Sequence, residues 1–375
     1  MRQAVLAVVV LSAAVLVSGT SAGATSGSAL SGRVLFSETT QYSYGSGSLY
    51  AINPNGSGRV LITNNAVNGS WSPDGRRILF ETARKGDLDL WTINADGSSP
   101  KELTFSVGID QDGAWSPDGS QIAFESNRNN PGGMDVFVMN ADGTHPQRLT
   151  DATGFNGDPT WSPDGKTIAF TSTRGGSKDI WTINTDGSGL QQLTTNPGTE
   201  ENPAWSPTGD QIAYDSDDGE PGNLDVWVMR SNGTNPHHLI DSPALDALPT
   251  WSPDGKQIAF ASDTSGKLNR KIYIANVAGS STPHLLAGAV RRGYLATLPS
   301  WGVHPAGDPC TIEGTIHADR LTGTKGSDVI CGGAGNDVIF ARDGKRDVVD
   351  GGPGRDTAYV DKGDVVRHVE KVLYR

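Results

Sequence analysis

The apolar positions repeat along most of the chain. Six tryptophans, at positions 71, 115, 161, 205, 251 and 301, are spaced 44, 46, 44, 46 and 50 residues apart. The first five are followed by Ser-Pro-Asp-Gly, or by Ser-Pro-Thr-Gly at 206–209, and then by alternating residues such as Ile168-Ala169-Phe170. Alternation with a period of two predicts a β-strand, and self-similarity at about 45 residues predicts an architecture of repeated units.

Each unit is expected to hold four short strands. The first strand ends at the Trp, and Ser-Pro-Asp-Gly then forms a type I turn. We therefore assign the Asp of this motif to turn formation rather than to a catalytic or binding site. The second strand is the alternating segment, the third follows a pattern such as 179–183, and the fourth ends in Leu-Thr, as at 149–150. An Asp-Gly or Asn-Gly pair joins the last two strands, and we expect it to take the positive φ of a type I′ turn.

Four antiparallel strands in about 45 residues are typical of a β-propeller blade. The second-strand pattern occurs six times, beginning with Val34-Leu35-Phe36, which predicts six blades. The chain enters at the second strand of one blade (33–63) and leaves near Trp301 at a first strand. That last strand must therefore complete the first blade and close the ring, which leaves no open sheet edge.

The recurring Trp-Ser-Pro-Asp-Gly-Lys-x-Ile-Ala-Phe, Asp-Ile-Trp, Asp-Gly and Leu-Thr motifs resemble the TolB-type, WD40-like propeller over about 33–305. TolB itself carries an additional α/β domain before its propeller. Here only about eight residues separate the predicted signal-peptide cleavage site from the first strand. We therefore do not expect a role in the Tol–Pal system.

The first strands would line the central channel of such a ring. Two sets of positions, polar in most of the blades, would point toward this channel. The first set lies three residues before each Trp, and the second set lies five residues before it. The first set is Asn68, Asp112, Asp158, Asn202, Leu248 and Leu298, and the second is Ala66, Asp110, Asn156, Glu200, Asp246 and Ala296. A cation or a basic peptide end would suit this channel mouth. The alternative that we favour is that they are solvated loop residues leading into a strand.

After Trp301 the composition changes. From Gly314 onward, Gly-rich segments that end in Asp repeat about every nine residues, and each is expected to form a turn. An apolar residue follows each Asp by two positions, at Leu321, Ile330, Ile339, Val349 and Ala358. This pattern resembles the RTX or haemolysin-type calcium repeat. The fold class predicted for the whole chain is therefore all-β: a six-bladed β-propeller followed by a short C-terminal parallel β-roll over 310–375, with 360–375 as a capping strand or helix.

The resemblance implies that Ca²⁺ binds between stacked turns, because one turn cannot supply the six to eight oxygens that the ion needs. It pairs the Asp residues of repeats i and i+2: Asp319 with Asp337, Asp328 with Asp347, and Asp337 with Asp356. The turn glycines whose carbonyls would help are Gly333, Gly335, Gly352 and Gly354. Two or three sites are expected, with dissociation constants of about 10⁻⁴–10⁻³ M. A flexible Gly/Asp-rich tail is the alternative.

Residues 1–24 show the charged start, apolar run and small residues of a secretory signal peptide, with a retained N-terminal anchor as the alternative. Cys310 and Cys331 are the two cysteines, and in an exported chain such a pair predicts a disulfide. A net charge of −12 argues against nucleic acid as a partner. No further segment is apolar enough to span a membrane. We expect a secreted monomer, with a periplasmic location as the alternative.

The sequence contains no motif that predicts a catalytic site. The only Gly-x-Ser-x-Gly, at 19–23, lies in the predicted signal peptide, and the adjacent His237 and His238 would point to opposite faces of a strand. We therefore predict a non-enzymatic, calcium-binding scaffold for a protein or glycan partner. One alternative is a periplasmic accessory protein that binds a peptide at the channel mouth, as TolB does. The other is an enzyme similar to six-bladed lactonases, in which Glu200, Asn202 and Asp158 would hold a metal.

Overall fold

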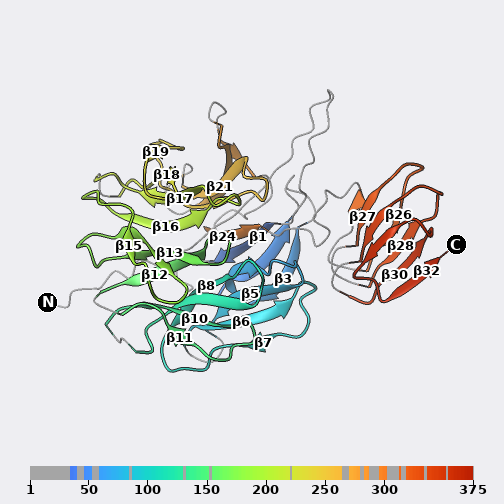
Figure 1. Cartoon of the computed structure of the whole chain (residues 1–375), viewed down its shortest axis with the longest axis horizontal. Coiled ribbons are helices and arrows are strands. Elements are labelled where there is room, and N and C mark those ends of the chain that lie inside the picture. Colours follow the sequence, from blue (N-terminus) through green and yellow to red (C-terminus); the bar gives the residue numbers. More distant parts are fainter. Residues whose placement is uncertain are drawn as a thin grey trace.

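The computed structural model describes residues 34–39, 46–52, 59–83, 87–129, 132–151, 154–219, 222–263, 270–278, 283–286, 295–301, 312–313, 318–332, 336–351 and 354–374. These parts of the chain form strands and turns without a helix. Six four-stranded antiparallel sheets lie around a ring, and two four-stranded parallel sheets form a second body at the C-terminal end (Figure 1). The described residues thus include no helix that could span a membrane. The predicted all-β class and six blades are confirmed.

The ring closes as predicted from the order of the motifs. The blade that contains the start of the described chain consists of β24 (Leu295–Trp301), β1 (Val34–Thr39), β2 (Ser48–Ile52) and β3 (Val60–Asn64), in that order. The last propeller strand pairs with the first, with Val34 opposite Trp301. Hydrogen bonds between strands about 260 residues apart therefore join the two ends of the propeller.

The other five blades follow one another along the chain. Their strands are β4 (Val67–Trp71), β5 (Arg77–Thr82), β6 (Asp89–Asn94) and β7 (Lys101–Glu102); β8 (Asp110–Trp115), β9 (Gln121–Ser126), β10 (Asp135–Asn140) and β11 (Gln147–Arg148); β12 (Asn156–Trp161), β13 (Thr167–Ser172), β14 (Asp179–Asn184) and β15 (Gln191–Gln192); β16 (Glu200–Trp205), β17 (Gln211–Ser216), β18 (Asp225–Arg230) and β19 (His237–His238); and β20 (Asp246–Trp251), β21 (Gln257–Ser262), β22 (Lys271–Asn276) and β23 (His284–Leu285).

The alternating second strand explains how neighbouring blades pack. Ile168 and Phe170 on β13 are fully buried in one cluster with Val136 and Val138 from β10 of the preceding blade. Trp161 adds a polar link across the same boundary, because its indole Nε1–H donates to the Ala114 carbonyl at 3.1 Å, and Trp251 bonds the Ala204 carbonyl in the same way at 3.0 Å. Burial of a Phe or Ile side chain contributes about 1.5–3 kcal/mol, so the apolar contacts between blades hold the ring together.

The turns agree with the prediction at one place and correct it at another. In Ser-Pro-Asp-Gly, the N–H of Gly165 donates to the Ser162 carbonyl at 2.9 Å, and the Ser162 hydroxyl donates to Asp164 at 2.7 Å, so this Asp serves the turn. The expected type I′ hairpin between strands three and four is wrong. Of the Asp186-Gly187 pair, Gly187 has a positive φ, of 86°, and Asp186 does not. A type I turn followed by a left-handed glycine accommodates the extra residue of this three-residue loop.

The fourth strand is shorter than predicted and stops before the Leu-Thr pair. In the β8–β11 blade the strand consists of Gln147–Arg148, and Thr150 then bonds through its side chain. Its hydroxyl accepts the Val136 N–H at 3.0 Å and donates to Asp135 at 3.1 Å. The threonine side chain therefore adds hydrogen bonds to β10 just beyond the end of the fourth strand.

The C-terminal body is the predicted parallel roll. One sheet contains β25 (Ile312–Glu313), β27 (Val329–Cys331), β29 (Val348–Asp350) and β31 (Val365–Arg367), and the other contains β26 (Arg320–Thr322), β28 (Val338–Ala341), β30 (Thr357–Val360) and β32 (Lys371–Tyr374). The apolar residues two positions after each Asp fill the space between the sheets, with Ile330, Ile339, Val349 and Ala358 at 0% exposure. The final segment forms strands rather than a helix.

Candidate calcium sites and the propeller channel

The aspartates that end the turns of the roll form a ladder. Each accepts the backbone N–H of the Asp two repeats earlier in the chain. The distances are 2.8 Å from Asp319 N to Asp337 Oδ1, 2.8 Å from Asp328 N to Asp347 Oδ1, and 2.7 Å from Asp337 N to Asp356 Oδ1. The structure thus brings together the three pairs that the resemblance to RTX repeats implies. Parallel pairing of alternate strands is the reason, because it stacks every second turn.

Asp337 and Asp356 each keep one carboxylate oxygen without a hydrogen-bond partner. Both side chains are 1% exposed, and the unpartnered atom is Oδ2 in each case. Burial is the main cause that raises the pKa of each carboxyl to about 7, and neighbouring carboxylates add to it. Buried oxygens that lack donors and repel one another fit a hard cation such as Ca²⁺.

Glycine is required where these oxygens gather. A Cβ on Gly332 would overlap the Gly351 carbonyl and come within 2.5 Å of Asp337 Oδ2. A Cβ on Gly351 would likewise overlap the His368 carbonyl and come within 2.6 Å of Asp356 Oδ2. The same arrangement of a carbonyl and a carboxylate oxygen therefore recurs in successive stacked turns.

The remaining predicted ligands are less uniform. Asp328 Oδ2 accepts bonds from the Thr324 N–H and hydroxyl at 2.6 and 2.9 Å, so this carboxylate already has donors. Burial raises the pKa of Asp347, which lies in the same stack. Gly354 lies exposed at its turn, whereas Gly333, Gly335 and Gly352 are outside the described residues. The strongest fit to a cation is on the side of the roll that carries Asp337 and Asp356.

Two acidic residues that extend the ladder were missed in the sequence. Asp364 Oδ1 accepts the Asp347 N–H at 3.0 Å, and Glu370 Oε2 accepts the Asp356 N–H at 2.7 Å. Each stands two positions before an apolar residue of the roll core, Val366 or Val372. That spacing is the same as in the five recognised repeats and could have identified both. The capping strands therefore continue the acidic face of the roll.

The polar residues of the first propeller strands are not solvated, which corrects our expectation. Asp112, Asp158 and Asn202 are 6%, 5% and 4% exposed, and their φ values lie between 50° and 55°. Each stands in a β-bulge, where a left-handed residue turns its side chain inward. The bulge N–H groups are bound by side chains of the preceding blade: Glu81 accepts from Asp112 N at 2.7 Å, and Glu125 from Asp158 N at 3.1 Å.

The second polar set accepts bonds from donors of its own blade, and Asn156 also donates to Asp135 of the preceding blade at 3.3 Å. The Arg128 guanidinium donates to Asp110 at 2.8 Å, the Ser172 hydroxyl donates to Asn156 at 2.7 Å, and the Ser216 hydroxyl donates to Glu200 at 3.1 Å. Asn202 donates instead to Asp215, at 2.7 Å. Glu200, Asn202 and Asp158, the set expected for a lactonase-like metal, thus have separate partners in the fold.

Negative charge accumulates where the bulges meet. Carboxylate oxygens of Asp112, Glu125 and Asp158 lie within 4.8 Å of one another, and neither oxygen of Asp112 has a hydrogen-bond partner. Burial raises the pKa of Glu125 to about 8 and that of Asp158 to about 6. The Lys178 ammonium pairs with Glu201 beside this cluster. We call Glu81, Asp112, Glu125 and Asp158 the channel carboxylates.

Comparisons with known proteins identify both bodies. A family model described as the TolB beta propeller domain matches residues 41–132, 129–221 and 197–294, which together span 41–294 of the 375 residues. The chain belongs to the TolB-type β-propeller family. A second model, described as the RTX calcium-binding nonapeptide repeat, matches residues 313–345, so the TolB-type propeller of this protein is followed by RTX repeats.

The Tol-Pal system protein TolB of Anaeromyxobacter dehalogenans strain 2CP-C is 46% identical over 46 residues, which are 12% of this chain and 11% of that protein. The chain thus matches only a small part of this curated relative. The crystal structure of TolB from Acinetobacter baumannii superposes with a TM-score of 0.64 at 20% identity, over 72% of this chain and 66% of that one. A putative TolB from Agrobacterium tumefaciens gives 0.56 at 20% identity, over 74% and 96%. Such identities show a shared fold alone.

Two expectations fall partly or wholly outside the described residues. The signal peptide at 1–24 lies entirely outside them, and so does Cys310. Cys331 is buried in β27. The signal peptide and the disulfide both remain predictions.

Proposed function

We propose that this protein is an exported, non-enzymatic calcium-binding protein whose propeller is a scaffold for a protein or glycan partner. In this proposal residues 1–24 direct export, 33–305 form the propeller and 310–375 form the calcium-binding roll. The observation that carries it is the pair of buried, unpartnered Oδ2 atoms on Asp337 and Asp356, which lie in stacked turns of the roll.

The chain's own residues explain what calcium would do in the roll. The ladder holds the backbone N–H of each Asp against the carboxylate two repeats later, which leaves the second carboxylate oxygen for a ligand. Two buried carboxylates, each with one oxygen that meets no donor, destabilise the stack when both are ionised. Ca²⁺ bound by Asp337, Asp356 and turn carbonyls would supply the missing positive charge, so binding stabilises the folded roll.

Calcium titration of the mature full-length chain tests this. We expect calorimetry to detect binding with a dissociation constant of about 10⁻⁴–10⁻³ M. Asp337→Asn keeps an oxygen that accepts the Asp319 N–H but removes the second carboxylate oxygen, so it should weaken binding at least about tenfold. Absence of any heat or circular-dichroism change with millimolar Ca²⁺ would refute the proposal.

The matched control is Asp142→Asn in a propeller hairpin. Asp142 accepts the Thr144 N–H at 2.9 Å, and in the β16–β19 blade Asn232 accepts the Thr234 N–H in the same way at 3.1 Å. The substitution should therefore preserve the turn and leave calcium binding unchanged. A loss of binding in this variant equal to that in Asp337→Asn would point to nonspecific charge effects.

For the propeller, exposed apolar side chains and acidity describe the surface offered to a partner. Phe105 and Val107, on one loop before β8, are 74% and 89% exposed. The chain carries a net charge of −12, which favours a partner that is basic or that presents cations. A pull-down with and without Ca²⁺ separates the alternatives. An outer-membrane lipoprotein would favour the periplasmic TolB-like role, whereas an extracellular protein or glycan would support the scaffold proposal.

A further inference from the structure

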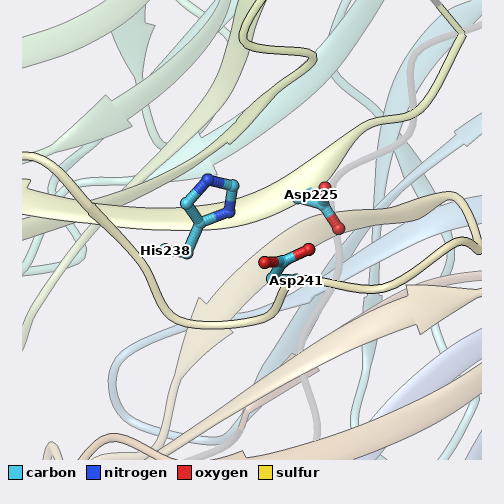
Figure 2. A group of neighbouring side chains, drawn as sticks. All are labelled: Asp225, His238 and Asp241. Atoms are coloured by element: carbon cyan, nitrogen blue, oxygen red, sulfur yellow. The ribbon is translucent and has the colours of Figure 1, made fainter. Parts of the chain in front are cut away.

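The β16–β19 blade carries a group of three metal-ligand side chains at its outer end. Asp225 begins β18, His238 ends β19, and Asp241 follows three residues later. Oxygen and nitrogen atoms of the three lie within 4.8 Å of one another. Figure 2 shows one imidazole nitrogen facing the two carboxylates. Among the described residues this is the one such group that includes a histidine.

Two of the three side chains are held in place by the fold. His238 pairs with Trp227 across the strands, and its ring lies against the indole with a centroid distance of 3.8 Å. Asp225 is 6% exposed and accepts the Ser242 N–H at 3.1 Å and an Asn223 amide N–H at 3.3 Å. Asp241 is exposed and can adjust its side chain. The arrangement is a positioned imidazole and carboxylate beside an exposed carboxylate.

In another blade, the Asp that corresponds to Asp225 has donors that balance its negative charge. In the β8–β11 blade, the Asp that begins the third strand is Asp135. It receives a hydroxyl from Thr150 at 3.1 Å and a guanidinium from Arg148 at 2.7 Å. Arg148 pairs with Phe137 across the strands as His238 does with Trp227. This blade thus carries its own permanent cation.

The β16–β19 blade lacks both of these donors. The position of Arg148 is taken by His238, and the position of Thr150 by Ile240, which is 7% exposed and packs in the apolar core. Ile240 offers no hydroxyl to Asp225. A second carboxylate, Asp241, stands next to it, and within the described part of the chain neither carboxylate forms an ion pair with a lysine or arginine. This group therefore combines two acidic side chains with the nitrogen of an imidazole.

We propose that Asp225, His238 and Asp241 bind a divalent transition-metal ion of the Zn²⁺ class. An imidazole nitrogen suits zinc and its neighbours, whereas calcium and magnesium prefer oxygen alone. Three protein ligands leave a coordination position for water, as exposure of His238 and Asp241 permits. Ligand atoms around tetrahedral zinc lie about 3.4 Å apart, given bonds of about 2.1 Å, so the three ligand atoms, which lie within 4.8 Å of one another, would draw closer around the ion. The site is distinct from the calcium sites of the roll and does not depend on them.

The test is zinc binding by the metal-free full chain in buffer saturated with Ca²⁺, which occupies the roll. We expect one equivalent of Zn²⁺ to bind and to raise the unfolding temperature. His238→Ala should weaken binding at least about tenfold. His237→Ala is the matched control, because this neighbouring histidine is also exposed and contacts the Asn235 carbonyl instead. It should bind as the unaltered protein does.

A second variant separates metal binding from folding. His238→Arg recreates the Asp-Arg pair of the β8–β11 blade, so it should keep the unfolding temperature in metal-free buffer while abolishing the zinc-induced increase. Absence of zinc binding by the unaltered chain would overturn the proposal. So would equal losses in His237→Ala and His238→Ala, or retained binding in His238→Arg. Calcium binding by the roll is measured separately, so the outcome does not bear on the proposed function.

Discussion

Replacing Glu125 with glutamine is expected to reduce the pH dependence of the propeller's stability. Glu125 is 1% exposed, and its carboxylate lies beside those of Asp112 and Asp158. Its two oxygens accept bonds from the Gln111 amide at 2.5 Å and from Asp158 N at 3.1 Å. In the glutamine variant Oε1 can keep the Asp158 bond, and rotation of the Gln111 amide can restore the other. The substitution therefore removes a titratable group with little change in shape.

The magnitude follows from the pKa. Burial is the main cause that raises the pKa of Glu125 from 4.5 to about 8, so the folded protein holds this proton more tightly than the unfolded chain does. The resulting stabilisation is fully present below pH 4.5 and is lost as the pH rises through about 8. A difference of this size corresponds to at most about 5 kcal/mol. The other channel carboxylates have raised pKa values as well, so the unaltered propeller should lose stability steadily between pH 5 and 8.

Urea unfolding followed by tryptophan fluorescence measures this effect. All nine tryptophans lie between residues 71 and 301, so the signal reports on the propeller and not on the roll. Glu125→Gln should show a shallower decline in the free energy of unfolding over this pH range. The control is Glu102→Gln on the outer strand β7, which is partly exposed and should leave the slope unchanged. A free energy that stays constant or rises from pH 5 to 8 in the unaltered protein would refute the reasoning, as would an unchanged slope in Glu125→Gln.

Two further substitutions probe the blade edge and the roll. Thr150→Val keeps the side-chain shape but removes the hydroxyl that bonds both the Val136 N–H and Asp135. Urea unfolding should therefore show that the free energy of unfolding falls by about 1–3 kcal/mol. A change near zero would contradict the assigned role of the hydroxyl. Gly332→Ala should weaken calcium binding in calorimetry, because its Cβ would overlap the Gly351 carbonyl. Gly363→Ala, where a Cβ meets open space, should have no such effect, and equal losses in both would argue against the stacked-turn geometry.

The repeat of the sequence was enough to predict the ring. The tryptophan period counts the blades, the alternating segments place the buried faces, and the offset at the two ends requires β24 to complete the first blade. These features are local, because strand alternation and turn formation depend on residues within a few positions of one another. The same holds for the apolar core positions of the roll, which follow from the Asp-to-apolar spacing, whereas the stacked Asp pairs were implied by the resemblance to RTX repeats. The spacing would also have identified Asp364 and Glu370.

Only the tertiary structure decided how the polar residues are used. The polar set of the first strands was expected to be solvated, but the left-handed bulge residues turn Asp112 and Asp158 into the protein beside carboxylates of the preceding blade. Likewise, the sequence places His237 and His238 on opposite faces of a strand without saying what either meets. Pairing of β18 with β19 brings His238 to Asp225 and Asp241, and comparison with Arg148 shows which charge is missing. Side-chain burial and contacts between strands depend on backbone conformation and on segments far apart in the chain, which no local pattern contains.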